Sequence, residues 1–309
     1  MNYDRILTKE IGELVAMEKA DFFGVTPIER LENAPQGYRA EEYLPGAASV
    51  ISIGVTLANG VCDVWGEASE AGKSISPYLF YGYGLLNLQM GRVANLVAKE
   101  LERKGYQSLT FPPTWLISFY KWFARRDGSL KGDFSHRHAA VAAGLGEFGW
   151  SGLVLVPNHG PRVRFNSIIT NAPLVPSPLY DGPRLCQPNK CAYQCVRECP
   201  TQALALYKDY KECDIDGKHF KYVHSDIIRC QYGIMALVKG SGSFGHREIP
   251  PGPGNMKDLR DAVAEMHPVD KAMIENGFGI ICGDFCGRCL HQCPAPSYEK
   301  ITKTNFRKL

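Results

Sequence analysis

The residues best suited to chemistry in this chain are cysteines, which gather in two groups that each end in Cys-Pro. The first group is spaced x4, x3 and x3, and the second contains Cys-x2-Cys-x3-Cys-Pro. Bacterial ferredoxins bind iron–sulfur clusters with C-x2-C-x2-C-x3-C-P, whose fourth cysteine ligates the other cluster. The sequence therefore predicts two [4Fe–4S] clusters. The cysteines concerned are Cys186, Cys191, Cys195 and Cys199, then Cys282, Cys286, Cys289 and Cys293.

Two cubane clusters need about eight thiolates, and the chain has eleven cysteines. The predicted ligands of the first cluster are Cys186, Cys191, Cys195 and Cys293. The predicted ligands of the second cluster are Cys199, Cys230, Cys286 and Cys289. Cys282 is an alternative to Cys230. Cys62 and Cys213 are expected to be small buried hydrophobic residues.

Disulfides and zinc explain these cysteines less well than iron does. A disulfide framework suits a short secreted chain, whereas this chain has 309 residues and its start does not resemble a signal peptide. Zinc sites built from C-x2-C pairs have no use for three closely spaced cysteines followed by Cys-Pro.

The composition is that of a soluble globular protein, with 45% hydrophobic and 22% charged residues. The net charge of +3 is too small to indicate a surface for duplex nucleic acid. No apolar stretch reaches the length of about 18 residues that a membrane span requires. We therefore expect a cytoplasmic protein with no membrane contact.

Helices and strands are expected to alternate in the first half of the chain, which predicts an α/β fold there. The predicted helices are 8–20, 76–105 and 137–143, and the predicted strands are 22–25, 49–56, 153–156 and 163–170. Thr8 is the expected cap of the first helix, and the last two strands are expected to pair. Three prolines shortly after Thr170 predict a linker. The predicted domains are therefore 1–178 and 179–300, followed by a tail at 301–309.

Gly144-Leu-Gly-Glu-Phe-Gly149 spells G-x-G-x-x-G, but a helix is predicted before it where a dinucleotide fold has a strand. Dinucleotide binding is therefore not predicted. Three glycines in six residues still permit close approach of the backbone to a bulky cofactor.

The order of several motifs resembles the cobalamin-dependent iron–sulfur reductases, which include epoxyqueuosine reductases and reductive dehalogenases. The similar stretches are 44–54, 135–149, 159–165 and the two Cys-Pro groups. This resemblance implies a nitroreductase-like, corrinoid-binding α/β (α+β) domain followed by a ferredoxin-like domain with two [4Fe–4S] clusters. It also implies that Cys230, between the two groups, is a ligand. No twin-arginine signal or helical-repeat tail is found, so the substrate stays open.

The resemblance directs attention to the glycine stretch and the strand after it as a cradle for cobalamin. The expected cofactor-binding residues are Gly144, Gly146, Gly149, Gly152, Arg162 and Arg164. Alternation along the strand puts both arginines on one side, and their planar guanidinium groups suit the nucleotide phosphate of cobalamin. A solvated strand face is the alternative explanation for the arginines.

The family uses an acid near the corrin to supply a proton. Asp133 is the first candidate, because epoxyqueuosine reductases carry their catalytic aspartate shortly before the glycine stretch. His136 is the second candidate and Tyr81 the third. Burial would raise the pKa of an aspartic acid and let it donate a proton near neutral pH.

The sequence thus favours a reductase that removes a leaving group from a small organic molecule or modified nucleoside, by dehalogenation or by epoxide or hydroxyl reduction. Electrons would come from a low-potential donor such as ferredoxin or flavodoxin and pass through both clusters to cobalt. One alternative is an electron-transfer or corrinoid-reducing protein without its own substrate, and another is flavin in the α/β domain. The sequence does not identify the substrate, the reductant or the oligomeric state.

Overall fold

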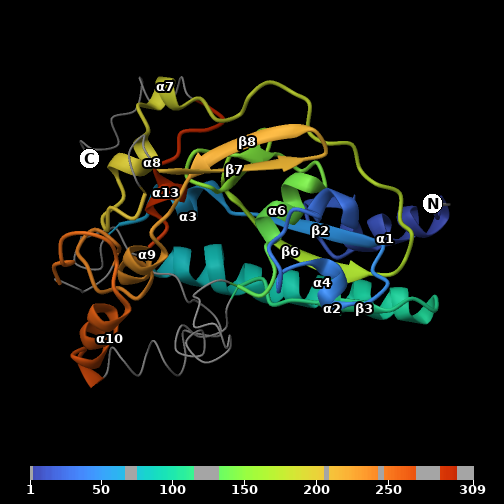
Figure 1. Cartoon of the computed structure of the whole chain (residues 1–309), viewed down its shortest axis with the longest axis horizontal. Helices are drawn as coiled ribbons and strands as arrows, with labels where there is room; N and C mark the ends of the chain where they lie inside the picture. The colour runs from blue at the N-terminus through green and yellow to red at the C-terminus, as the bar shows by residue number, and fades with distance from the viewer. Residues whose placement is uncertain are drawn as a thin grey trace.

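The structure is a computed structural model that describes residues 3–66, 75–114, 132–204, 209–242, 247–268 and 286–297. Long helices and a sheet make up the N-terminal region, and short helices with one hairpin make up the cysteine-bearing region (Figure 1). The mixed α/β class is therefore confirmed. Among the helices of the described segments, none has both the length and the apolar character needed to cross a membrane.

A four-stranded antiparallel sheet lies at the centre of the N-terminal region. Its strands are β1 (Phe22–Pro27), β2 (Ser49–Thr56), β6 (Val163–Thr170) and β3 (Ser108–Thr110), in that spatial order. β2 and β6 pair along their whole length. Both strands are almost entirely buried, which suits their content of β-branched residues.

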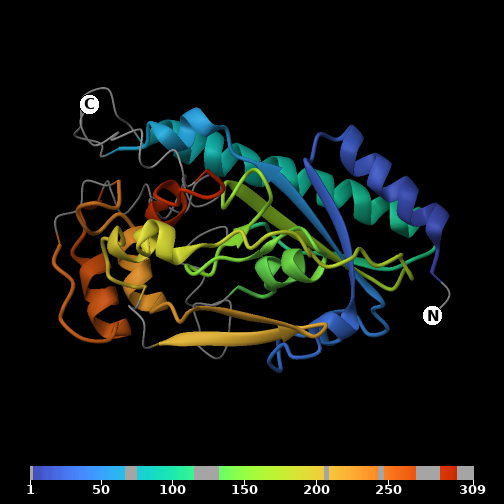
Figure 2. The same ribbon diagram turned by 90° about the horizontal axis from the view of Figure 1, so that it is seen from above.

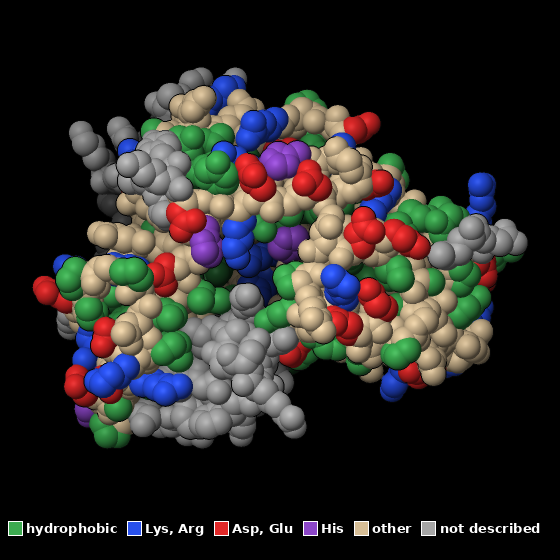
Figure 3. Space-filling view, in the orientation of Figure 1, with side chains coloured by type: hydrophobic (Ala, Val, Ile, Leu, Met, Phe, Trp, Pro, Cys, Tyr) green, Lys and Arg blue, Asp and Glu red, His purple; other side chains and the backbone are tan. Residues whose placement is uncertain are grey.

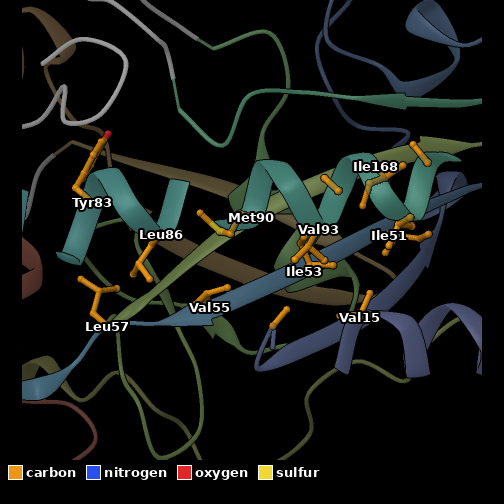
Figure 4. Packing of buried hydrophobic residues seen from close by; sticks show 14 of the residues in the cluster. Val15, Ile51, Ile53, Val55, Leu57, Tyr83, Leu86, Met90, Val93 and Ile168 are labelled. Atoms are coloured by element: carbon orange, nitrogen blue, oxygen red, sulfur yellow. The ribbon is translucent and has the colours of Figure 1, made fainter. Parts of the chain in front are cut away.

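Two helices, α1 (Arg5–Met17) and α4 (Leu85–Arg103), cover one face of this sheet. α4 continues from a π-helical segment, η2 (Tyr78–Gly84). Figure 4 shows side chains of α4, Met90 and Val93 among them, directed at the sheet, with Val93 beside Ile53. All three are fully buried. This apolar layer is the largest core of the described residues.

A shorter helix, α6 (His136–Ala142), packs on the opposite face of the sheet. Ser135 caps it, since its hydroxyl accepts a hydrogen bond from the His138 backbone N–H. Figure 2 shows α6 and the β7–β8 hairpin on one side of the sheet and α4 on the other. A two-stranded sheet of β4 (Glu147–Phe148) and β5 (Val154–Leu155) follows α6.

The cysteine-bearing region contains little regular structure. Its elements are α7 (Pro188–Cys191), α8 (Gln194–Arg197), β7 (Tyr210–Ile215), β8 (Lys218–Val223), α9 (Ile227–Ile234), α10 (Met256–Ala264) and α13 (Arg288–His291). The hairpin of β7 and β8 packs against the region before the predicted domain boundary, because Ile215 belongs to one cluster with Val141 and Phe148. The boundary near Pro178 stays a prediction. The remaining short helices are η1 (Ile28–Leu31), α2 (Ala40–Tyr43) and α3 (Asn59–Asp63).

Most predicted elements are present, and two details are wrong. Thr8 does not cap the first helix, because the helix begins at Arg5 and the Asp4 carboxylate accepts from the Leu7 N–H at 2.8 Å. The segments 153–156 and 163–170 do not pair. A tight turn between Val156 and Gly160 closes on itself with two backbone hydrogen bonds of 2.9 Å, so β6 leaves β5 and joins the central sheet.

Candidate metal and active site

Four cysteines from two distant segments line one small cavity, and we call them the first cysteine set. Its members are Cys186, Cys191, Cys195 and Cys293. The pKa of the Cys293 thiol is raised to about 12, chiefly by burial and also by the nearby Cys186 and Cys191. Gly149 and Trp150 from the N-terminal region line the same cavity.

Local backbone geometry brings the first cysteine set together. Ala192 and Tyr193 both adopt positive φ, at 47° and 54°, and turn the chain sharply between α7 and α8. Such angles are uncommon for residues other than glycine and cost energy. The Glu147 carboxylate accepts from the backbone N–H groups of Leu185 and Cys186 at 2.7 and 3.0 Å. It thereby ties the start of this loop to the N-terminal region.

A second group forms around Cys289, and we call Cys199, Cys286 and Cys289 the second cysteine set. The pKa of Cys289 is raised to about 11, chiefly by burial and also by Cys199, while the guanidinium of Arg137 opposes the shift. Cys286 also lies within electrostatic reach of Cys199 and Cys289. α13 carries Cys289 and packs against α8.

Cys230 lies on α9, next to the second cysteine set. A Cβ added to Gly233 would lie 3.3 Å from the Cys286 sulfur. Gly233 follows Cys230 by three residues on the same helix, so the two residues share a helix face. Cys282 lies outside the described residues. The preference for Cys230 as the fourth ligand stays a prediction.

No three Cys, His, Asp or Glu side chains within the described segments converge as ligands of a single metal ion. A cubane cluster differs because each thiolate binds a separate iron at its own corner. The thiols of Cys186, Cys289 and Cys293 have raised pKa values because they are buried, and a bound metal reverses this effect by holding the thiolate. The indole Nε1 of Trp150 is buried without a hydrogen-bond partner in the described part of the chain. A sulfur-rich group would satisfy it, so the residues present fit iron–sulfur clusters.

Two cysteines lie apart from both sets. Cys62 is 3% exposed in the α4 core, and burial raises its pKa to about 11. This confirms the expectation of a small buried hydrophobic residue. Cys213 is half-buried beside Tyr222, and burial also raises its pKa to about 11.

The glycines predicted to approach cobalamin mostly approach the protein itself. A Cβ on Gly144 would lie 1.9 Å from the Pro178 carbonyl oxygen, and a Cβ on Gly146 would lie 2.0 Å from that of Leu155. The need for glycine at both positions therefore follows from close packing of this backbone. Gly149 borders the cysteine cavity, and the Gly152 carbonyl accepts from Arg137 Nη1 at 2.8 Å.

Arg162 and Arg164 lie on the α3 and α4 side of the sheet, as the strand alternation predicts. Arg162 donates to Asn59 at 2.8 Å and to Asp63 at 2.7 Å. Arg164 donates to the Asn87 side-chain oxygen at 2.8 Å, and its guanidinium carbon lies 3.7 Å from the centre of the Tyr83 ring. Neither arginine is on a solvated strand face, and both are held by other residues of the chain. Their predicted contact with a phosphate stays a prediction.

Asp133 lies in a well-anchored loop just before α6. Its carbonyl accepts from the Tyr43 hydroxyl at 2.6 Å. The next residue, Phe134, is buried and stacks on Phe111 with the ring centres 5.3 Å apart. The half-buried Asp133 is therefore placed by its neighbours.

His136 is fully engaged in hydrogen bonds inside the protein. Its Nε2 lies 2.9 Å from the Pro112 carbonyl, which only accepts, so Nε2 carries the proton. Nδ1 then accepts from the Ser167 hydroxyl at 3.0 Å. Burial lowers the pKa of His136 to about 4, so the ring is neutral at pH 7. This arrangement does not favour His136 as an acid.

Tyr81 lies on η2 and is 57% exposed. Its ring contacts Phe80, whose centre lies 4.9 Å away. An exposed phenol has the access to solvent that His136 lacks, but it lacks the fixed surroundings of Asp133. The structure therefore separates the three candidate acids by environment.

Figure 3 shows a hollow below the β7–β8 hairpin in which Lys or Arg and His side chains gather. Arg137 and His138 of α6 lie beside the hairpin, and His138 Nε2 is 3.1 Å from the Tyr222 hydroxyl. The pKa of His138 is lowered to about 4, chiefly by burial and also by the charges of Arg137 and Lys211.

The segment carrying the second cysteine set also packs on the N-terminal region. The His291 ring stacks on the Trp65 ring, with the ring centres 5.0 Å apart. The Arg288 guanidinium carbon lies 4.5 Å from the centre of the Trp65 ring. His291 Nδ1 donates to the Cys62 carbonyl at 3.2 Å. Sequence reasoning missed these contacts, and it also missed Trp150 and Arg137. Trp150 follows the glycine motif directly, which is the one signal that marked its position.

Comparison with known proteins confirms the resemblance to both kinds of reductase. The tetrachloroethene reductive dehalogenase of Sulfurospirillum multivorans is 42% identical over 67 residues, which cover 21% of this chain and 13% of that protein. The epoxyqueuosine reductase of Listeria monocytogenes is 25% identical over 171 residues, or 51% of this chain and 43% of that protein. The chain thus spans less than half the length of these relatives. No family model matches the chain.

A solved reductive dehalogenase, described in terms of B12-dependent dehalogenation, has the same fold. It matches with a TM-score of 0.51 at 18% sequence identity, over 85% of this chain and 34% of the other chain. The chain is therefore a relative of the reductive dehalogenases and epoxyqueuosine reductases, and it shares the fold of the solved enzyme.

Proposed function

We propose that this protein is a cobalamin-dependent iron–sulfur reductase that removes a leaving group from a small organic molecule or a modified nucleoside. The observation that carries the proposal is that half-buried cysteines of both Cys-Pro groups come together, three of the first group with Cys293 around one cavity and Cys199 with Cys286 and Cys289 beside it. This is the crossing pattern by which two-cluster ferredoxin runs share their cysteines. Relatives that are reductases support the type of reaction.

The cysteines of the chain would hold two clusters in neighbouring positions. Cys186, Cys191, Cys195 and Cys293 would bind one cluster, and the second set together with Cys230 would bind the other. When bound, the clusters supply electrons and reduced cobalt supplies a nucleophile or electron donor. An external low-potential donor such as ferredoxin or flavodoxin would provide the electrons.

Asp133 is the proposed proton donor. Its neighbours Phe134 and Ser135 fix the loop through a buried ring stack and a helix cap, so the backbone that carries the half-buried Asp133 is held in place. His136 would serve as a positioning residue, because its two ring hydrogen bonds connect Pro112 to Ser167. The predicted cobalamin contacts of Gly144, Gly146, Arg162 and Arg164 have less support, since each is occupied by contacts within the chain.

The proposal is tested with protein purified without oxygen, reconstituted with iron and sulfide, and incubated with cob(III)alamin. We expect cobalt to remain with the protein on gel filtration. With a low-potential reductant such as titanium(III) citrate added, we expect halide release or epoxyqueuosine reduction in a panel containing both substrate classes. Two loaded clusters without retained cobalamin would instead favour an electron-transfer or corrinoid-reducing protein. A flavin released from the purified protein would point to the other alternative, a flavin in the α/β domain.

Substitution of the proposed acid tests its role separately. Asp133→Asn should keep iron and cobalt and reduce turnover by about 10²- to 10⁴-fold, the usual contribution of general acid catalysis. Asp181→Asn removes an exposed carboxylate and should change neither. Unchanged turnover in the Asp133 variant would remove this residue from the reaction.

A further inference from the structure

Trp150 belongs to the N-terminal region by sequence but lines the cavity of the first cysteine set. It directly follows Gly149, which lines the same cavity. A turn closed by the hydrogen bond from the Gly152 N–H to the Gly149 carbonyl, 2.9 Å long, presents Trp150 to the cysteines. The N-terminal region therefore supplies part of the wall around these thiols.

Trp150, which lines this cavity, has two N–H donors. Its backbone N–H donates to the Cys186 sulfur, with nitrogen and sulfur 3.2 Å apart. Its indole Nε1 is buried and has no partner among the described residues. A buried N–H without an acceptor is costly, and the indole nitrogen is a donor only. The indole N–H of Trp150 therefore needs a hydrogen-bond acceptor that the described side chains around it do not provide.

Two residues of the cysteine-bearing region hold Trp150 in place, one through its ring and one through its backbone. The Tyr193 ring meets it edge to face, with centres 5.2 Å apart and planes 81° apart. The Trp150 carbonyl accepts from the Val223 N–H of β8 at 2.8 Å. A donor with so restricted a position can make a directional bond to whatever occupies the cavity.

We propose that Trp150 tunes the reduction potential of the cluster on the first cysteine set, through its backbone bond to Cys186 and an indole bond to a second sulfur of that cluster. This inference rests on the proposed function, since it requires the cluster. Reduction adds negative charge to a cluster, and hydrogen bonds to its sulfurs stabilise that charge and raise the potential. The N-terminal region would thereby influence the energy of an electron held in the cysteine region.

The test is a redox titration of Trp150→Phe followed by electron paramagnetic resonance. Phenylalanine keeps an aromatic ring and the backbone N–H but lacks the indole donor. We expect one of the two cluster couples to move to a more negative potential while the other stays unchanged. Trp65→Phe is the matched control, because the Trp65 indole is also buried without a partner in the described segments but lies outside the cavity. That control should leave the affected couple where it is.

An unchanged potential in Trp150→Phe, or an equal shift in both variants, would overturn the inference. A wild-type protein without reducible clusters would instead refute the proposed function, so the two failures are distinguishable.

A second measurement tests the inference if Trp150→Phe does not assemble its clusters. Protein labelled with ¹⁵N at the indole nitrogens of tryptophan is reduced and studied by pulsed electron paramagnetic resonance. We expect a weak coupling between a cluster and one indole ¹⁵N that persists in Trp65→Phe. A spectrum without any indole coupling would contradict the inference, whatever the fate of the Phe variant.

Discussion

In the N-terminal region, α1 and α4 bury whole apolar side chains against a continuous sheet, whereas around the cysteines the four-residue helices α7, α8 and α13 carry half-buried thiols. The core around Ile53 and Met90 extends over the full length of α4. The cluster around Val196 contains only three buried residues among those described, and Cys195, Cys199 and Cys289 pack against it.

This difference indicates that the two regions are stabilised by different means. Four-residue helices have no independent stability in water, and the positive φ angles of Ala192 and Tyr193 add strain. Metal binding to thiolates provides folding free energy in small domains of this kind. We expect the sheet region to depend on apolar burial and the cysteine region to depend on iron.

The largest expected effect follows from removing iron. Chelation of the reconstituted protein should remove hydrogen-exchange protection from the short helices α7, α8 and α13, because their buried thiols lose the metal that holds them. β2 and β6 should keep their protection, since their hydrogen bonds and core contain no metal ligand. Equal protection of both regions before and after chelation would contradict the comparison.

Sequence patterns predicted the sheet region well, because its elements repeat apolar residues at the spacing of helices and strands. The strand at 49–56 and the helix at 137–143 are found with bounds that differ by at most one residue. The pairing partner of β6 was wrong, because pairing depends on how a turn directs the chain and local pattern carries no such information. The first-helix cap was wrong because Asp4 competes with Thr8, and either residue type can cap.

The candidate site was predictable only in part. Cysteine spacing indicated which thiols could lie close together, and Cys186, Cys191, Cys195 and Cys293 line one cavity, but their role as ligands stays a prediction. The spacing did not predict Trp150, because its contact with Cys186 depends on how β8 and the glycine turn meet in space. The packing of Gly144 against Pro178 was also hidden, since a glycine needed by a cofactor and one needed by the backbone look identical in sequence.

Replacement of a proposed ligand should cost about half of the iron. Cys293→Ala is expected to retain about four of eight irons per chain, because each cubane contains four. Cys62→Ala removes a thiol that is buried in the apolar core and should retain all the iron. The measurement is iron per chain after identical reconstitution. If the two variants retain equal amounts, Cys293 is not a ligand.

A substitution in the apolar core should lower stability without loss of iron, in contrast to a ligand substitution. Ile53→Ala is expected to lower the free energy of unfolding by about 2–5 kcal/mol, because Ile53 is fully buried between the sheet and α4. Ile6→Ala changes a side chain that is 75% exposed and should change the free energy of unfolding by less than about 0.5 kcal/mol. Urea unfolding measures both values. Iron content should be unchanged in both variants, and a large loss of iron in Ile53→Ala would show that the two regions are not independent.

A smaller effect is expected from pH acting on the sheet region through His136. Burial lowers its pKa from 6.5 to about 4 in the folded protein, so between these values the unfolded chain binds the proton and the folded chain does not. The contribution of His136 to the free energy of unfolding is therefore fully present above its pKa in the unfolded chain, and it is lost as the pH drops toward its pKa in the folded protein. Between pH 7.5 and pH 5 the loss should be about 2 kcal/mol.

Urea unfolding at the two pH values checks this prediction. His136→Asn should reduce the difference between them by a similar amount, since the variant has no imidazole to titrate. An identical pH dependence in the wild type and the variant would exclude His136 as its source.

The central claim is that both cysteine sets hold iron–sulfur clusters, and the most direct test is a count of iron and acid-labile sulfide in the chain purified without oxygen. We predict about eight of each per chain, with a reduced spectrum typical of two [4Fe–4S] clusters. Zinc in place of iron, or iron without sulfide, would contradict the account.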